Sequence, residues 1–210
     1  MNQIFTFFVL SLLCVYHIHC LYIKSTNDTD DFEFINLSCK SRSDALIKSN
    51  PTCFSKQCKR IVKDFQFDMS DISNLLNIAE KGMYARNSNG IGGPTMLDIN
   101  TGYVRDSNGL DNLFAFENKI FTENDFDIYS RIIHKLKSLI EIQFAIENVY
   151  FTAPTFITRL DGRNEWKPNE IHDEYWHIHV DMNNTAHYQY SGLLYLSTFN
   201  QDFSGGRLVF

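Results

Sequence analysis

The stretch VYFTAPTFITRL, residues 149–160, marks the point where the sequence changes from helical to strand-like. Threonine, valine, isoleucine and aromatic residues dominate it, and these residue types favour extended backbone. Similar short runs follow as EYWHIHVD (174–181), YQYSGLLYLSTF (188–199) and RLVF (207–210), separated by polar or glycine-containing segments. This spacing predicts the antiparallel strands of a β-sandwich or barrel.

Two amphipathic helices are predicted ahead of these runs. The first begins near Ser70, which is placed to cap its start, and Gly82 is placed to help end it. The second runs from Asn124 to about Ile146, and the stretch TMLDINTGYV (95–104) between the helices is strand-like. The predicted fold class is therefore α+β, with the helices laid against the β-sandwich. The positions expected to face the core are Ile72, Leu75, Leu76, Ala79 and Met83 in the first helix and Ile132, Ile133, Leu136, Leu139, Ile140 and Phe144 in the second.

The composition suits one folded domain. The chain has 210 residues, of which 44% are hydrophobic and 14% aromatic, which is enough for a packed core. Its formal net charge is -6, and no basic stripe is visible that could follow a phosphate backbone. Nucleic acid is therefore not an expected partner.

The N-terminus has the character of a targeting segment. The apolar stretch from Ile4 to Tyr16 has the length of a signal-peptide core, and residues 1–20 are expected to form either a signal peptide or a signal anchor that holds the protein to a membrane. Residues 21–57 then form a lumenal polar stretch, in which Asn27 and Asn36 begin glycosylation sequons. These features predict a protein of the secretory pathway, in the lumen or membrane of the endoplasmic reticulum.

Three cysteines follow the targeting segment, at Cys39, Cys53 and Cys58. In an oxidising compartment they allow one disulfide and one remaining thiol, and the sequence does not determine which pair forms. A zinc site built on Cys53 and Cys58 lacks a second pair of ligands. A structural disulfide or a free thiol is therefore favoured over a zinc site.

The run EYWHIHVD places His177, His179 and Asp181 at alternating positions. Alternate side chains of a strand share one face, with successive Cα atoms among the three roughly 6–7 Å apart. Two neighbours can therefore chelate one ion, and His179 with Asp181 supplies two positions of a 2-His-1-carboxylate iron site. The ordinary alternative is a set of polar side chains on a half-exposed strand.

Three motifs occur in order after the helices: HVD (179–181), LLYLS (193–197) and GGRLVF (205–210). Together they resemble the prolyl 4-hydroxylase-type branch of the 2-oxoglutarate- and Fe(II)-dependent dioxygenases. The similarity runs from about Cys58 to Phe210, so the resemblance implies that residues 58–210 form the dioxygenase domain, a jelly roll or double-stranded β-helix with the helices packed on it.

The resemblance also implies roles for individual residues. His179 and Asp181 would be iron ligands, and the phenol of Tyr195 would hydrogen-bond the far carboxylate of 2-oxoglutarate; the alternative for Tyr195 is an aromatic core residue. His177 would have a supporting role. The implied cofactors are Fe(II), 2-oxoglutarate as cosubstrate and L-ascorbate, and the implied activity is hydroxylation of an unidentified protein or small-molecule substrate.

The chain departs from the family pattern after Asp181. A second iron histidine and a Lys or Arg that pairs with 2-oxoglutarate are expected several dozen residues later, but residues 182–210 contain one histidine, His187, which is expected to lie too close. We therefore expect a domain incomplete at its C-terminus and inactive by itself. The alternative is a non-catalytic lumenal jelly-roll binding module. A metallo-β-lactamase-type zinc hydrolase is disfavoured because Met182 stands where its signature requires histidine.

Overall fold

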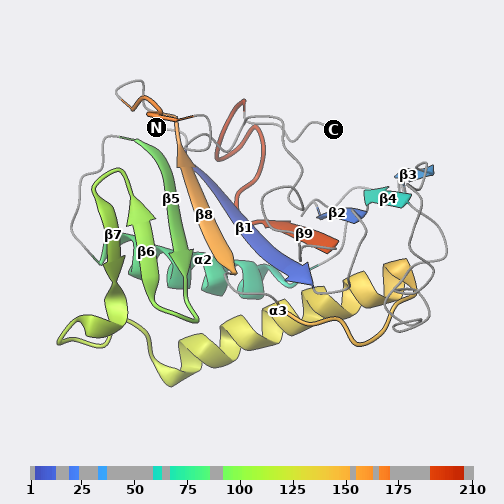
Figure 1. Cartoon of the computed structure of the whole chain (residues 1–210), viewed down its shortest axis with the longest axis horizontal. Coiled ribbons are helices and arrows are strands. Elements are labelled where there is room, and N and C mark those ends of the chain that lie inside the picture. Colours follow the sequence, from blue (N-terminus) through green and yellow to red (C-terminus); the bar gives the residue numbers. More distant parts are fainter. Residues whose placement is uncertain are drawn as a thin grey trace.

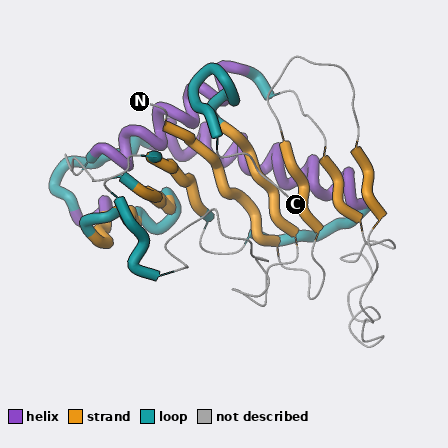
Figure 2. Tube along the Cα trace, turned by 90° about the horizontal axis from the view of Figure 1, so that it is seen from above, coloured by secondary structure: helices purple, strands orange, loops and turns teal. Residues whose placement is uncertain are grey.

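Two helices lie against one face of a nine-stranded sheet in the computed structural model, as Figures 1 and 2 show. The strand order is β3-β4-β2-β9-β1-β8-β5-β6-β7, and neighbouring strands are antiparallel except that β2 runs parallel to both β4 and β9. The strands are β1 (Gln3–Leu12), β2 (His19–Ile23), β3 (Glu33–Asn36), β4 (Lys59–Val62), β5 (Gly93–Asp98), β6 (Tyr103–Asp106), β7 (Gly109–Asn112), β8 (Phe156–Asp161) and β9 (Tyr190–Tyr195). The structure describes residues 3–12, 19–23, 33–36, 59–62, 67–85, 92–151, 155–162, 166–170 and 190–205.

Helix α2 (Met69–Tyr84) begins two residues earlier than the sequence predicted. Its N-cap is Asp68, whose carboxylate accepts a hydrogen bond of 2.8 Å from the backbone N–H of Ser70, so the prediction that Ser70 caps the helix is wrong. An aspartate caps as well as a serine does, and the tertiary structure selects between them. Gly82 lies inside the helix and is buried, and a Cβ at this position would lie 2.6 Å from the Leu97 side chain in β5. The glycine therefore allows the helix to approach the sheet closely and does not end the helix.

Helix α3 (Glu123–Phe144) agrees with its predicted position within two residues at each end. Thr122 and Asp125 form a capping box at its start, and Ala145 ends it in the left-handed conformation. The predicted core positions of both helices are buried, except that Leu76 and Leu139 are half-buried at the edge of the core. Ile78, which is 1% exposed, is a core residue that the sequence analysis did not name.

The stretch expected to be strand-like, residues 95–104, is a hairpin of β5 and β6. Asp98 forms the turn: its carboxylate accepts from the backbone N–H of Asn100 at 3.0 Å and from the hydroxyl of Thr101 at 2.8 Å. Gly102 completes the turn with φ 75°, a left-handed value that suits glycine. An aspartate followed by asparagine and glycine is typical of such a turn. A short 3-10 helix, η1 (Leu113–Ala115), then follows β7.

The N-terminal residues contribute strands to this sheet. Strand β1 lies between β8 and β9 and is antiparallel to both, and β2 pairs with the other edge of β9 (Figure 1). Within the stretch expected to act as a targeting segment, residues 3–12 are therefore extended, and the processing of this stretch stays a prediction. No helix in the described part of the chain is long and apolar enough to cross a membrane.

The observed architecture confirms the α+β class. Helices α2 and α3 pack on the sheet through Leu75, Leu136 and their buried neighbours, all of which belong to one core cluster with Leu97 and Ile157 of the sheet. The described strands form a single sheet, so the jelly roll and its incomplete C-terminus remain predictions.

Candidate functional site

The two faces of strand β8 have different surroundings. Ile157 belongs to the core that the helices cover, and the guanidinium of Arg159 lies 4.8 Å from the ring centre of Tyr84 in α2. Because successive side chains of a strand point to opposite faces, Thr158 points away from the helices. It is nevertheless only 1% exposed, so this second face of the sheet is also covered.

Strand β9 has the same division between faces. The ring of Tyr190 packs 5.2 Å from that of Phe144 in α3, and Leu194 is fully buried in the same core. Leu193 and Tyr195 therefore share the face away from the helices, as expected from their alternate positions. Leu193 is 6% exposed, and Tyr195 is half-buried.

The register of the sheet joins these positions into one row across three neighbouring strands. Thr6 of β1 pairs with Tyr195 on one side and with Thr158 on the other, and Thr158 pairs in turn with Met96 of β5. Paired residues of antiparallel strands share a face. We call Tyr195, Thr158 and Met96 the Tyr195 row, and it marks the candidate site.

The predicted iron ligands cannot be placed relative to this row. His179 and Asp181, together with His177 and His187, lie outside the residues that the structure describes. Within the described ranges, no three His, Cys, Asp or Glu side chains come close enough together to hold a metal ion. The iron site therefore remains a prediction from the sequence, whereas the position of Tyr195 is observed.

Arg159 is a buried cation next to the row, but it points to the opposite face. It is 7% exposed, and its Nη2 donates a hydrogen bond of 3.1 Å to the hydroxyl of Thr95. Thr95 and Arg159 pair across β5 and β8, one row away from Thr158. Arg159 therefore joins the sheet to α2 and does not supply a positive charge to the face that carries Tyr195.

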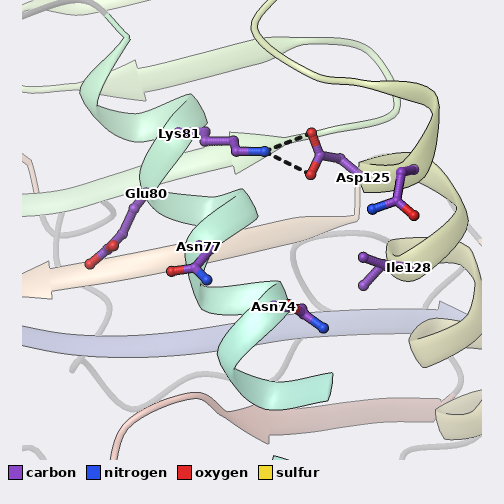
Figure 3. Close-up of a pocket in the computed structure, with 7 residues that line it drawn as sticks. Asn74, Asn77, Glu80, Lys81, Asp125 and Ile128 are labelled. Atoms are coloured by element: carbon purple, nitrogen blue, oxygen red, sulfur yellow. Dashed lines mark hydrogen bonds and ion pairs between the residues drawn. The ribbon is translucent and has the colours of Figure 1, made fainter. Parts of the chain in front are cut away.

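The structure also has an open polar groove between the two helices, shown in Figure 3, with a volume of about 500 Å³. The ammonium of Lys81 donates to both carboxylate oxygens of Asp125 at 2.8 and 2.9 Å, so this lysine is neutralised by its partner. The helices cover the face of the sheet opposite Tyr195, so the groove is separate from the candidate site. The groove is lined by Asn74, Asn77, Glu80, Lys81, Asn124, Asp125 and Ile128.

Asp125 is held in its charged form. Burial alone would raise the pKa of this carboxyl group, but hydrogen bonds from Lys81 and from the backbone and side chain of Thr122 outweigh burial and lower the pKa below its ordinary value. The carboxylate is thus both the capping-box residue of α3 and the anchor for α2. Its role is to fix the two helices against each other.

Tyr129 has the opposite shift. Burial in the core of α3 raises its pKa far above the ordinary value, and its hydroxyl accepts a hydrogen bond of 3.0 Å from the side-chain amide of Asn100. Asn100 belongs to the turn formed by Asp98, so this contact joins the β5–β6 hairpin to α3. The phenol stays neutral and has a structural role.

The sequence analysis did not single out three buried polar residues that the structure describes: Thr158, Asp125 and Tyr129. For Asp125, the pattern of a threonine followed three residues later by an acidic residue could have indicated the capping box. For Thr158 and Tyr129 no local signal exists, because their surroundings come from elements distant in the sequence.

Several curated proteins are similar to this chain. The proteins named 2-oxoglutarate and iron-dependent oxygenase domain-containing protein 3 from mouse, rat and human are 34%, 35% and 32% identical to it over 183 residues. That region is 84% of this chain and 56% of each relative, so the chain spans little more than half the length of these proteins. No family model matches the chain. No solved structure matches it either.

These comparisons confirm the resemblance that the ordered motifs predicted. The relatives carry the name of an oxygenase that depends on 2-oxoglutarate and iron. The chain is thus similar, over most of its length, to proteins whose names indicate the family of 2-oxoglutarate- and iron-dependent oxygenases.

Proposed function

We propose that this chain belongs to an Fe(II)- and 2-oxoglutarate-dependent dioxygenase that hydroxylates a substrate in the secretory pathway. The observation that carries the proposal is the similarity over 183 residues to relatives named as such oxygenases, in a chain that contains HVD, LLYLS and GGRLVF in order. The place of Tyr195, on a covered sheet face away from the helices, supports the proposal because a bound cosubstrate must be shielded from water.

Different residues of the chain have different proposed roles. His179 and Asp181 would hold the iron, which with 2-oxoglutarate and O₂ supplies oxidative decarboxylation to succinate and CO₂ and the hydroxylation of a C–H bond. The phenol of Tyr195 would donate a hydrogen bond to the carboxylate of 2-oxoglutarate that is far from the metal. The sheet would keep this carboxylate in a fixed position and exclude water from it.

The polar groups of the described face fit an acidic cosubstrate. Tyr195 and Thr158 bring two hydroxyl groups to it, and the carboxylate-bearing Asp161 lies on the opposite face of β8, together with Arg159. Hydroxyl donors bind a carboxylate, whereas a nearby carboxylate would repel it.

L-Ascorbate is proposed as the reductant that sustains turnover.

The test is succinate formation by purified full-length protein. We expect conversion of 2-oxoglutarate only with Fe(II), its loss in His179→Ala, and normal activity in His134→Ala, which replaces an exposed histidine of α3. Folding of each variant is checked by circular dichroism. Turnover that survives His179→Ala would refute the ligand assignment. A folded wild type without iron-dependent turnover would favour the non-catalytic binding module.

A second variant tests the cosubstrate contact. Tyr195→Phe removes the phenol hydroxyl and keeps the ring, so we expect KM for 2-oxoglutarate to rise by about tenfold with a smaller change in kcat. Tyr103→Phe is the control, because Tyr103 lies in β6 and is 47% exposed. Equal KM values in the two variants would argue that Tyr195 is a core residue.

We also propose that residues 1–20 direct the protein into the secretory pathway. The apolar stretch from Ile4 to Tyr16 and the sequons at Asn27 and Asn36 support this proposal. Expression in cultured cells should give a glycosylated protein whose mobility increases after N-glycosidase treatment. Replacing both asparagines by glutamine should abolish that shift. An unglycosylated wild type in the cytosol would contradict the proposed location.

A further inference from the structure

An exposed aromatic surface lies where the chain passes from the sheet into α3. After β7 the chain forms η1 and then turns into α3 (Figure 1). Three phenylalanines of this segment are exposed: Phe114 by 51%, Phe116 by 37% and Phe126 by 36%. We call these three residues the Phe114 surface. Large apolar side chains that gather on the outside of a folded protein mark a site of interaction.

The rings of this surface are supported by the structure beneath them. Phe114 lies on the β5–β6 turn, where a Cβ added to Gly102 would be 2.7 Å from its ring. Its ring centre is 6.3 Å from that of Phe126, which packs edge-on against the buried ring of Phe121 at 5.9 Å. Side chains that are already held in place lose little freedom when a partner binds. The rings are therefore suited to docking.

The surroundings of the Phe114 surface are acidic. Residues 111–127 contain five carboxylates and one cation, Lys119, so this short stretch has a formal charge of -4, compared with -6 for the whole chain. Glu117, Glu123 and Asp127 are exposed, and none of them forms an ion pair with another residue in the described ranges. The surface therefore has unneutralised negative charge at its edge.

Two of these carboxylates lie next to the aromatic rings. Glu123, Phe126 and Asp127 belong to the first turns of α3, and residues three and four apart on a helix are neighbours on its surface. The helix dipole favours Glu123 in the first turn, but its effect declines beyond that turn and does not account for Asp127. Like charges four residues apart repel each other. A cation between Glu123 and Asp127 would remove this repulsion.

Aromatic rings beside carboxylates match the chemistry of arginine. A guanidinium group can stack on a ring and pair with a carboxylate at the same time. The chain contains one such stacked contact, in which the guanidinium of Arg159 lies 4.8 Å from the ring centre of Tyr84. Among the described residues, no cation occupies the corresponding place over Phe114 or Phe126.

The charge also decides among possible occupants. A second copy of the chain would bring the same carboxylates face to face, and like charges that meet across an interface are unfavourable. An anionic lipid surface would be repelled for the same reason. A basic segment of another protein is attracted by these carboxylates.

We propose that the Phe114 surface docks an arginine-rich segment of a partner protein, whose guanidinium groups stack on Phe114 and Phe126 and pair with Glu123 and Asp127. The inference goes beyond the proposed oxygenase activity, because docking here requires neither iron nor 2-oxoglutarate. The surface lies at the β7 end of the sheet, away from Tyr195 in β9.

The test measures binding of labelled peptides to the full-length protein by fluorescence anisotropy at low salt. Nona-arginine should bind, nona-glutamate should not, and nona-lysine should bind about fivefold more weakly than nona-arginine, because an ammonium group stacks less well on a ring. The affinity for nona-arginine should fall as salt is added.

Substitutions separate the aromatic contribution from the charge. Phe114→Leu keeps an apolar side chain in place, so it should fold, as checked by Tm, and should bind nona-arginine about three- to fivefold more weakly. Phe114→Trp should bind at least as tightly as wild type, because tryptophan is the better cation–π partner. The double variant Glu123→Gln/Asp127→Asn should bind about two- to tenfold more weakly and depend less on salt.

Two controls lie at the other end of α3. Ile142→Leu changes an apolar side chain that is 70% exposed, and Glu147→Gln removes an exposed carboxylate beyond the helix. Both variants should bind nona-arginine as wild type does. Equal loss of binding in a control and in its matched variant would refute the assignment to the Phe114 surface.

Four other results would overturn the inference. These are a wild type that does not bind nona-arginine, and equal binding of nona-arginine and nona-lysine that Phe114→Leu leaves unchanged, which would show attraction by charge alone. Self-association of wild type that is lost in Phe114→Leu, measured by sedimentation, would identify a second copy as the occupant. Binding to phosphatidylserine vesicles that is lost in the same variant would identify a membrane. None of these results depends on 2-oxoglutarate turnover.

Discussion

Replacing Asp125 by asparagine is expected to weaken the contact between α2 and α3. The carboxylate accepts hydrogen bonds from Lys81 in α2 and from the backbone N–H and hydroxyl of Thr122, all between 2.8 and 2.9 Å. Asparagine keeps the size and one acceptor oxygen, but it removes the charge and turns an amide group towards one of the donors. The substitution therefore tests electrostatics with little change in packing.

The size of the effect follows from the exposure of each partner. The side chain of Lys81 is 45% exposed, so solvent screens its ion pair, and the pair contributes at most about 1 kcal/mol. The capping-box bonds to Thr122 become neutral, which costs about 0.5–1 kcal/mol. The free energy of unfolding should fall by about 1–2 kcal/mol, and Tm by about 2–8 °C for a chain of this length.

The effect should depend on pH. The pKa of Asp125 is lowered in the folded protein, so its contribution to stability is present above the ordinary carboxyl pKa of about 3.9 and is lost as the pH falls through the lowered folded value. Urea unfolding of wild type and variant should therefore differ near neutral pH and converge in acid. Asp127→Asn, an exposed aspartate in the same turn, should change stability by less than about 0.5 kcal/mol at either pH.

A double-mutant cycle identifies the part due to Lys81. Lys81→Met should cost about 1 kcal/mol or less by itself and almost nothing in the Asp125→Asn background. The reasoning would be refuted by an Asp125→Asn variant as stable as Asp127→Asn, or by a difference from wild type that does not diminish in acid.

Three further changes probe the core and the turns by thermal and urea unfolding. Leu136→Ala, at a fully buried position, should lower the free energy of unfolding by about 2–5 kcal/mol. Ile142→Ala, at a 70% exposed position of the same helix, should change it by less than about 0.5 kcal/mol. Similar losses in the two variants would contradict the burial of Leu136. Tyr129→Phe should cost about 1–2 kcal/mol near neutral pH, because an amide loses its acceptor. The raised pKa of Tyr129 makes wild-type stability fall above about pH 10, and that part of the decline should be missing in the variant. Gly102→Ala should destabilise the protein more than Gly109→Ala. Both glycines have positive φ, but only at Gly102 would a Cβ contact a ring, that of Phe114 at 2.7 Å. The reverse order of stabilities would contradict this packing.

The sequence determined the elements with strong local signals. The helical spacing of apolar residues located α2 and α3 and most of their buried positions, because a periodic face can be buried in only one way. Runs rich in threonine, isoleucine and aromatic residues located β8 and β9 in the same manner. The ordered motifs that contain His179, Asp181 and Tyr195 indicated the family, since such motifs encode chemistry directly.

The structure decided what depends on contacts between distant segments. Whether Ser70 or Asp68 caps α2, and whether Gly82 ends that helix or packs against Leu97, are settled by the approach of the helix to the sheet. The hydrogen bond from Asn100 to Tyr129, which joins the β5–β6 hairpin to α3, likewise depends on the tertiary structure. Local propensity is too weak to choose among such alternatives when tertiary contacts are worth as much.

The candidate site shows the same division most clearly. The sequence by itself named Tyr195 through its motif. Only the tertiary structure, through the register of β1 with β8 and β9, brought Thr158 into the same row. Strand register is fixed by pairing across the sheet, and no single stretch of sequence contains that information.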